Sequence, residues 1–345
     1  MGDPQAPFST VLAVLDRHGL LGGDGRLRDD VQLVSMGDHF DWGPPAERAR
    51  ATTDAIALVS WLAAHPPDQV VLLAGNHDLA RVCELAPFRT DDDFEHAWRS
   101  ATLVYRSGAP HPAEEAEFLT RFPHVPDAEC LARDFSCFST EQQRLVTELL
   151  RTGRFRLAWA HRGLLLVHAG VTLDDLTLVA APVDDAHAVA AHLNAFFEAR
   201  IAAWEGGPLE LGPLHQPGSA SGGVARGILF HRPARPAEPP DDWFHGPPRR
   251  RFDPRRLPPA FPQAIGHIRD KKCRELLGAW AAGGAAGDGP LRALTFAGDE
   301  PRYVRGTPPD ARLYFLDGGM LHTSPERYEL FDLDARRALS PARSG

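Results

Sequence analysis

The sequence has few cysteines and no long apolar run, which are the features of disulfide-rich and membrane proteins. Its four cysteines, Cys83, Cys130, Cys137 and Cys273, form no Cys-x-x-Cys pair among 345 residues. We therefore expect reduced thiols in a cytoplasmic protein and no disulfide framework. No apolar run approaches the roughly 20 residues of a membrane-spanning helix, so membrane insertion is not expected.

Positive charge is also in deficit. Lys and Arg number 37 against 46 Asp and Glu, which gives a net charge of −9 at pH 7. This balance does not favour a nucleic-acid duplex or an anionic membrane as a partner. Hydrophobic residues make up 43% of the chain, enough for a sizeable core. We therefore expect a globular α/β protein, with a single domain over residues 1–335.

Two apolar runs that end in polar residues are the most informative feature of the chain. Residues 70–74 lead into Gly75-Asn76-His77-Asp78, and residues 31–36 lead into Gly37-Asp38-His39-Phe40-Asp41. A helical pattern over 46–65 separates the two runs, which predicts a β-α-β unit with parallel strands. Ligands bind at the carboxyl ends of such strands, so the pattern predicts an active site there.

The rest of the chain predicts an elaborated domain. Between 79 and 160 the pattern is helical, which predicts an insertion beside the sheet. Residues 233–262 are rich in Pro and Arg, and we expect a surface loop with Arg249-Arg250-Arg251 on a solvated face. Residues 336–345 are expected to form a disordered tail. Further strands are expected at 164–167, 227–230, 264–265, 291–296 and 312–316, and further helices at 8–20, 141–150 and 185–204.

The polar residues at the strand ends share one kind of chemistry. They are carboxylates, imidazoles and one amide, with no thiolate: Asp3, Asp38, Asp41, Asn76, His77, Asp78, His168 and His267. This mixture suits divalent Mn, Fe and Zn ions. A carboxylate can bridge two ions about 3.5–4 Å apart, and such a pair activates a water for attack on phosphorus. For Asp78 a helix cap is the better interpretation.

Five ordered segments resemble the motifs of calcineurin-like metallophosphoesterases: Gly2-Asp3-x-Gln5, Gly37-Asp38-x-x-Asp41-x-Gly43, Gly75-Asn76-His77-Asp78, His168-Ala169-Gly170 and Gly266-His267. The second segment is similar to the phosphoprotein-phosphatase branch and its bacterial relatives, which include diadenosine tetraphosphate hydrolases. The resemblance implies an α/β (α+β) fold, in which a β-sandwich of two mixed sheets is flanked by helices.

The resemblance also implies a role for each residue. Asp38 would bridge two metal ions, Asp3 and Gln5 would hold the first, and Asn76, His168 and His267 would hold the second. His77 would be the general acid that protonates the leaving-group oxygen, with Asp41 orienting it. The expected cofactors are two divalent ions, Mn²⁺ first, with Fe or Zn as alternatives.

Three positions depart from the family pattern. Arg269 stands where many members carry another ligand His, but the phosphoprotein-phosphatase branch also lacks that His, so this departure is minor. Gln5 stands where the family has a His ligand, and an amide oxygen binds Mn²⁺ or Fe²⁺ more weakly, so the first metal site is expected to be weaker or more Mg²⁺/Mn²⁺-like. Trp42 replaces an arginine that clamps phosphate, and an indole cannot act as a guanidinium. We expect Trp42 to pack. Arg226 and Arg232 resemble arginines that reach the phosphate, and surface charge is the alternative for both.

The first motif poses a separate question, because only Met1 precedes Gly2-Asp3 and the strand that normally leads into this motif is missing. Either the natural start lies upstream, or Asp3 lies on an unanchored terminus and binds metal poorly. We favour the upstream start.

The expected function is metal-dependent hydrolysis of a phosphate ester by a metal-bridging hydroxide at a dinuclear site. A pseudophosphatase that binds a phosphorylated ligand without turnover is one alternative, suggested by Gln5, Trp42 and the missing strand. A dinucleoside polyphosphate hydrolase is another. The substrate stays open between a small molecule, a nucleotide and a phosphoprotein.

Overall fold

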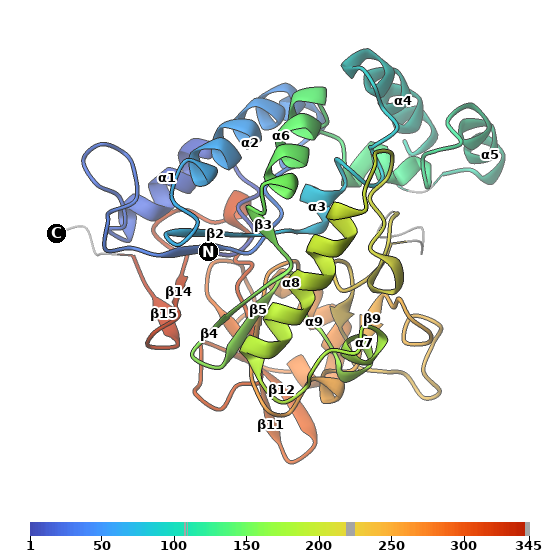
Figure 1. The fold of residues 1–345 in the computed structure, drawn as a ribbon. Helices are drawn as coiled ribbons and strands as arrows, with labels where there is room; N and C mark the ends of the chain where they lie inside the picture. The colour runs from blue at the N-terminus through green and yellow to red at the C-terminus, as the bar shows by residue number, and fades with distance from the viewer. Residues whose placement is uncertain (107, 109, 219–224, 342–345) are drawn as a thin grey trace.

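The computed structural model describes residues 1–106, 108, 110–218 and 225–341. The chain is a mixed α/β protein with two main sheets (Figure 1). A three-stranded parallel sheet has the order β1-β2-β3, formed by Leu33–Ser35, Val70–Leu73 and Phe155–Arg156. A six-stranded mixed sheet has the order β12-β11-β13-β10-β5-β4, formed by Glu300–Arg305, Arg292–Ala297, Leu313–Phe315, Gln263–Ile265, Leu164–Val167 and Ala158–His161.

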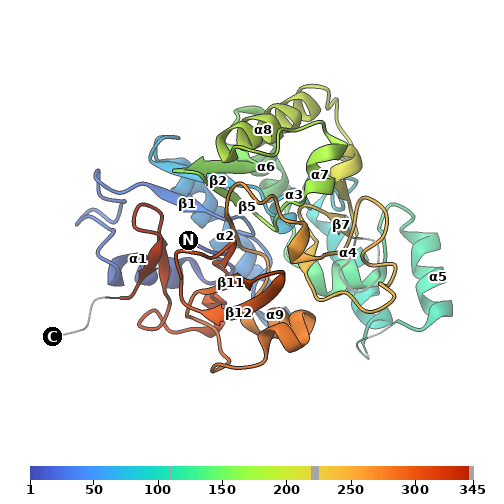
Figure 2. The same cartoon turned by 90° about the horizontal axis from the view of Figure 1, so that it is seen from below.

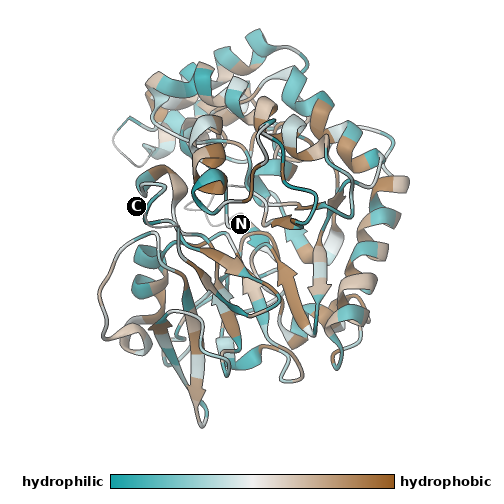
Figure 3. Ribbon diagram, turned by 90° about the vertical axis from the view of Figure 1, so that its left-hand side faces the viewer, coloured by the Kyte–Doolittle hydropathy of each residue, from teal (hydrophilic) through white to brown (hydrophobic). Residues whose placement is uncertain are grey.

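The two sheets share a buried apolar layer. Side chains alternate between the faces of a strand, and Val34 and Val71 of the small sheet cluster with Leu164, Leu166 and Ala264 of the large one. The alternate residues of β1 and β2, Leu33, Val70 and Leu72, belong to a second cluster that includes helix residues. The strands are mostly hydrophobic, and many outer helix residues are hydrophilic (Figure 3). This pattern is that of a sandwich flanked by helices, as expected.

Helices cover the outer faces of the sheets. Their bounds are α1 Phe8–Arg17, α2 Arg48–Ala63, α3 Asn76–Leu79, α4 Asp91–Val104, α5 Pro112–Arg121, α6 Thr140–Arg151, α7 Leu173–Leu178, α8 Ala186–Ala202 and α9 Asp270–Leu277. Helix α2 packs on β2, and α8 packs on β4 and β5. The predicted start of α6 is confirmed, because Ser139 and Gln142 form a capping box there.

Helices α4 and α5 form a lobe at the opposite end of the molecule from the β11–β12 hairpin (Figure 1), and Figure 2 shows the same lobe at the edge of the molecule. They occupy the middle of the region 79–160 that is predicted to be helical. At the end of that region the chain returns to strands, because β3 joins the small sheet and β4 the large one. No helix within the described ranges is both long and apolar enough to cross a membrane.

The chain start is tied to the small sheet. The Met1 ammonium donates to the Val34 carbonyl at 2.9 Å, and the Met36 N–H donates to the Met1 carbonyl at 3.1 Å. A Cβ on Gly2 would lie 1.9 Å from the Leu316 carbonyl oxygen, so this backbone also lies against the end of β13. The alternative of an unanchored Asp3 is therefore wrong.

Three other expectations need correction. The strand expected over 227–230 is limited to β7 (Arg226–Gly227), which pairs with β6 (His215–Gln216). After it the chain turns, because the N–H groups of Phe230 and His231 both donate to the Gly227 carbonyl, at 2.9 and 2.8 Å.

The Pro/Arg-rich segment is not a solvated excursion at its arginine run. Arg249 and Arg250 are buried, with 9% and 7% of their surface exposed. Arg249 Nη1 donates to Asp174 at 2.9 Å, and β9 (Arg251–Phe252) pairs with β8 (Arg232–Pro233). Backbone pairing and this ion pair draw the arginine run inward.

The expected disordered tail is wrong over its first part. β15 (Arg337–Leu339) pairs antiparallel with β14 (Leu330–Asp332), and this small hairpin is backed by buried Leu330 and Phe331. Residues 342–345 lie outside the described ranges.

Candidate active site

The turns after the strands hold the polar residues in an uncommon backbone conformation. Asp38, Asp41 and His267 have φ angles of 55°, 60° and 63°. Left-handed backbone costs a non-glycine residue about 1–3 kcal/mol and persists where its surroundings enforce it, often at functional sites. Three of the predicted site residues are therefore held in strained turns.

Two glycines let carboxylates lie against the backbone. A Cβ on Gly75 would be 2.2 Å from Asp38 Oδ1, and a Cβ on Gly266 would be 2.0 Å from Asp3 Oδ1. No side chain fits at such distances, so glycine is required at both positions for this close approach. The glycines of the third and fifth motifs thus place the two carboxylates.

Asp78 fixes the turn that carries Asp38. Its carboxylate accepts from the Gly75 N–H at 2.8 Å, which caps α3, and from the N–H groups of Asp38 and His39 at 3.0 Å each. It also pairs with His39 Nδ1 at 2.9 Å. Asp78 therefore does more than the predicted cap, because it joins the ends of β1 and β2.

One half of the site is a compact group of potential metal ligands. Atoms of Asp38, His168 and His267 lie within 4.8 Å of one another. His168 Nδ1 lies 2.8 Å from the Met36 carbonyl, and its Nε2 lies 3.2 Å from Asn76 Oδ1 and 3.4 Å from Asp38 Oδ1. A histidine whose one nitrogen donates to a carbonyl presents the other as a ligand.

His267, at the edge of this group, is oriented in the same way, with one ring nitrogen at a backbone carbonyl. Its Nε2 lies 2.9 Å from the Phe230 carbonyl, which leaves Nδ1 as the other ring nitrogen. Its ring packs against that of His168, with centroids 5.0 Å apart. Burial, together with Arg232 and His168, lowers the pKa of His267 well below its usual value, so its imidazole is neutral, as a metal ligand must be.

The other half of the site carries two crowded carboxyl groups. Asp3 Oδ2 accepts from the His267 N–H at 2.6 Å, and Asp3 Oδ1 is buried with no partner among the described residues. Burial, with the charges of Asp317 and Asp38, raises the pKa of Asp3 well above its usual range. Burial, with Asp288 and Asp38 nearby, raises the pKa of Asp317 to about 6. A cation would relieve this repulsion.

Asp317 is a residue that the sequence interpretation missed as part of the site. It directly follows the apolar strand expected at 312–316 and precedes two glycines, which is the pattern that identified the other strand ends. Gln5 lines the same half. Its Nε2 donates to the carbonyls of Phe40 and Asp41 at 2.9 and 3.2 Å, which leaves its amide oxygen as the group with ligand character.

His77 and Asp41 form the predicted acid pair. His77 Nδ1 lies 3.0 Å from Asp41 Oδ2, and the His77 N–H donates to Asp38 Oδ1 at 2.9 Å. Burial lowers the pKa of His77, but the charges of Asp38 and Asp41 outweigh it and raise the pKa to about 9. Asp41 is also bound by fully buried Arg81 and by the Cys137 N–H at 2.8 Å.

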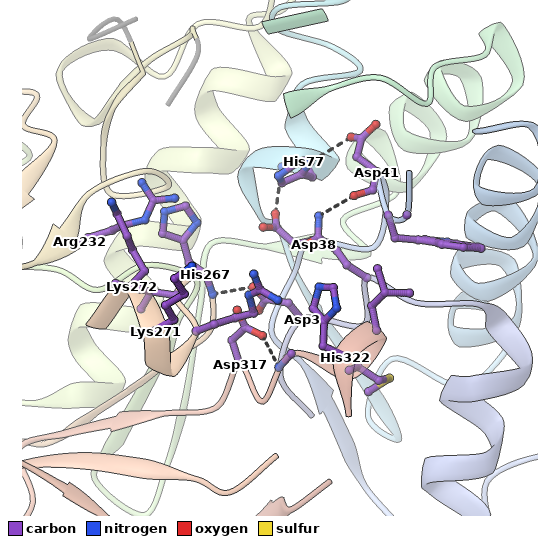
Figure 4. Close-up of a pocket in the computed structure, with 18 of the residues that line it drawn as sticks. Asp3, Asp38, Asp41, His77, Arg232, His267, Lys271, Lys272, Asp317 and His322 are labelled. Carbon is purple, nitrogen blue, oxygen red and sulfur yellow. Dashed lines mark hydrogen bonds and ion pairs between the residues drawn. The ribbon is translucent and has the colours of Figure 1, made fainter. Parts of the chain in front are cut away.

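A cavity of about 780 Å³ opens onto both halves (Figure 4). Of the predicted site residues it is lined by Asp3, Gln5, Asp38, Asp41, His77, Arg232 and His267. Asn76 and His168 are buried behind this lining, and Arg226 in β7 does not reach it. In Figure 4, Arg232, Lys271 and Lys272 gather on the side of His267, opposite His77 and Asp41. We call this cavity the pocket.

Trp42 lies in the pocket wall and packs as expected. Only 3% of its surface is exposed, and it clusters with Ala51 and Cys137. It does not replace the missing phosphate-clamping arginine.

Comparison with known proteins gives one family match. The model of the calcineurin-like phosphoesterase family matches residues 1–248, which includes every motif except the one with His267. No curated protein sequence matches the chain significantly.

Two solved phosphatase structures are similar at a low level. A cold-active protein tyrosine phosphatase is 12% identical, with 95% of this chain and 70% of that chain covered and a TM-score of 0.41. The cold-active protein-tyrosine phosphatase of a psychrophilic Shewanella species is 11% identical, with 95% and 71% covered and a TM-score of 0.39. These values are too low to bear on the substrate.

Proposed function

This chain belongs to the calcineurin-like phosphoesterase family and is a hydrolase of phosphoester bonds, and we propose that it acts through two divalent metal ions in the pocket. The main support for the proposal is the contact between the metal-ligand group and the acid pair. The ligand group Asp38, His168 and His267 adjoins the acid pair His77 and Asp41, because Asp38 Oδ1 faces both His168 and the His77 N–H.

The residues present fit two cations. Asp38, Asn76, His168 and His267 would hold one ion, and Asp3, Asp38 and Gln5 would hold the other, with Asp317 beside it. The orphaned Asp3 Oδ1 and the raised pKa of Asp317 both support a cation in the second position. When bound, such ions supply Lewis-acid activation of water and of the phosphoryl oxygens. Mn²⁺ is proposed first because the ligands are oxygens and imidazoles.

The protein itself supplies the proton that the leaving group needs, and His77 holds it. His77 lines the pocket, and its Nδ1 is bound to Asp41, so Nε2 is the nitrogen left to face the substrate. The hydrogen bond to Asp41 and its charge raise the pKa of His77, which favours a protonated imidazole as the donor. Asp41 holds the ring in place, and the transfer goes from Nε2 to the leaving-group oxygen.

Phosphate binding falls to Arg232. It lines the pocket next to His267, whereas Arg226 does not line it. We therefore propose Arg232 alone as the guanidinium that receives the phosphoryl oxygens, in place of the family arginine that Trp42 replaces. A guanidinium presents paired N–H donors that match two phosphate oxygens.

One observation favours a second substrate class. Besides Arg232, three cationic residues line the pocket, namely Arg269, Lys271 and Lys272. Lys272 pairs with Glu275 at 2.7 Å and Arg269 with Asp288 at 3.6 Å. The gathering of four cationic side chains still suits a chain of phosphates, as in a dinucleoside polyphosphate, better than a single phosphate. Turnover is proposed rather than the binding-only pseudophosphatase, because the acid pair and the ligand group are both complete.

The test is hydrolysis of p-nitrophenyl phosphate after chelation and addition of Mn²⁺. We expect Mn²⁺ to restore turnover, Asp38→Asn to abolish it, and Glu300→Gln, an exposed carboxylate on β12, to leave it unchanged. No Mn²⁺-dependent turnover in the wild-type chain on p-nitrophenyl phosphate or diadenosine tetraphosphate would overturn the proposal.

A further inference from the structure

A second group of side chains with metal-ligand chemistry lies outside the pocket lining. Atoms of Cys83, Glu84 and His215 lie within 4.8 Å of one another. The three side chains are buried, with 2%, 3% and 5% of their residue surface exposed. None of them lines the pocket, and none belongs to the five motifs.

Backbone contacts bring the group together from two distant segments. Cys83 and Glu84 lie in the turns after α3. The Leu209 N–H donates to the Val82 carbonyl at 2.7 Å, and Cys83 Sγ lies 3.2 Å from the Leu209 carbonyl. The Gly218 N–H donates to Glu84 Oε1 at 2.9 Å. The segment 209–218 is thereby held against the residues that follow α3.

His215 is oriented but has no hydrogen bond. Its ring stacks on Phe230, with centroids 5.3 Å apart and planes 7° apart. Neither ring nitrogen has a partner among the residues that the structure describes, and the same holds for Glu84 Oε2. A neutral imidazole always carries one N–H, so a buried donor and a buried carboxylate oxygen both lack a bond here. Buried polar groups without partners indicate that a bound ion or water satisfies them.

We propose that Cys83, Glu84 and His215 bind a zinc ion, separate from the catalytic metals. Thiolate, imidazole and carboxylate are the ligands of protein zinc sites, and the two anionic ligands offset the charge of the ion. Ligand atoms around a tetrahedral zinc lie about 3.5 Å apart. The three ligand atoms here lie within 4.8 Å of one another, so a closure of little more than an ångström at most would form the site. The catalytic ligands include no thiolate, which distinguishes the two sites chemically.

The zinc ion would connect two segments that carry or support catalytic residues. Glu84 and Cys83 follow the helix that carries Asn76 and His77. His215 stacks on Phe230, whose carbonyl lies 2.9 Å from His267 Nε2. A zinc ion, with a water as its fourth ligand, would therefore hold the segment that supports His267 against the turns behind His77.

Absorption spectroscopy of the Co²⁺-loaded full-length protein tests the proposal. A thiolate bound to Co²⁺ gives a near-ultraviolet charge-transfer band that carboxylate, amide and imidazole ligands cannot give. We expect this band in the wild-type protein and in Asp38→Asn, where the catalytic site is impaired. Its loss is expected in Cys83→Ser but not in the matched control Cys273→Ser, a buried thiol outside the group. No thiolate band in the wild-type protein, or a band that survives Cys83→Ser, would overturn the site.

Zinc content gives a second measurement that does not depend on Co²⁺. Asp38→Asn is expected to retain a single tightly held zinc ion after dialysis, and the added change His215→Phe, which keeps the aromatic stack on Phe230, is expected to lose it. Equal zinc content in the two proteins, both folded by circular dichroism, contradicts the proposal.

Discussion

Arg81 holds Asp41 through two parallel hydrogen bonds, from Nη1 to Oδ2 at 2.7 Å and from Nη2 to Oδ1 at 2.8 Å. The same Oδ2 faces His77 Nδ1 at 3.0 Å. Burial raises the pKa of Asp41, but Arg81 and His77 outweigh it and lower the pKa below its usual value. Arg81 is therefore a positioning residue, because it keeps Asp41 ionised and fixed against His77.

Replacing Arg81 tests this relationship. Arg81→Lys keeps the charge but loses the planar pair of donors, and we expect the free energy of unfolding to fall by about 1–3 kcal/mol because buried acceptors lose partners. The rate should fall more for phenyl phosphate, whose leaving group needs a proton, than for p-nitrophenyl phosphate. Exposed Arg28→Lys is the control. An equal loss on both substrates would mean that Arg81 serves stability alone.

Replacing His77 is expected to change the rate in a way that depends on the leaving group even more strongly. His77→Gln removes the proton donor, and kcat for phenyl phosphate should fall by about 10²–10⁴-fold. The loss should be smaller for p-nitrophenyl phosphate because its leaving group departs as a stable anion. His187→Gln, exposed on α8, should change neither rate. A loss of the same size on both esters would refute the acid role.

Replacing Gly75 tests whether the Asp38 carboxylate must lie against the Gly75 backbone. Gly75→Ala places a methyl group 2.2 Å from Asp38 Oδ1, so Asp38 must move. We expect a loss of stability of about 1–3 kcal/mol together with weaker metal binding, measured by unfolding and by metal titration. Gly23→Ala, where a Cβ would meet no atom within 4 Å, should change neither. Unaltered Mn²⁺ affinity in Gly75→Ala contradicts the placement of Asp38.

The lysines that line the pocket predict a preference for polyphosphate substrates. Replacing both Lys271 and Lys272 by Ala should raise KM for diadenosine tetraphosphate about tenfold, since two partly exposed charge contacts contribute up to about 1 kcal/mol each. KM for p-nitrophenyl phosphate should stay the same. Arg305→Ala, exposed on β12, controls for overall charge. A matching rise for both substrates would exclude a polyphosphate-binding role for these lysines.

The sequence allowed prediction of the parts of the site that follow strands. Asp38, Asn76, His77 and His168 each come directly after an apolar run, and the parallel pairing of β1 with β2 brings the first three together. The β-α-β unit follows from local periodicity, so its elements were predictable within a few residues.

The parts that were missed depend on contacts between distant segments. Arg81 has no signal of its own beyond its place one helical turn after His77. Glu84 and His215 are 131 positions apart (215 − 84), and no local pattern links them. The burial of Arg249 was hidden for the same reason, because its partner Asp174 lies 75 residues away.

Electron paramagnetic resonance of the Mn²⁺-loaded protein is the decisive measurement for the dinuclear site, because it reports whether two ions share a bridging ligand. We expect an exchange-coupled spectrum from two Mn²⁺ ions in the wild-type protein and its loss in Asp38→Asn. A wild-type spectrum of isolated Mn²⁺ at saturating metal, with turnover present, would contradict the dinuclear site bridged by Asp38.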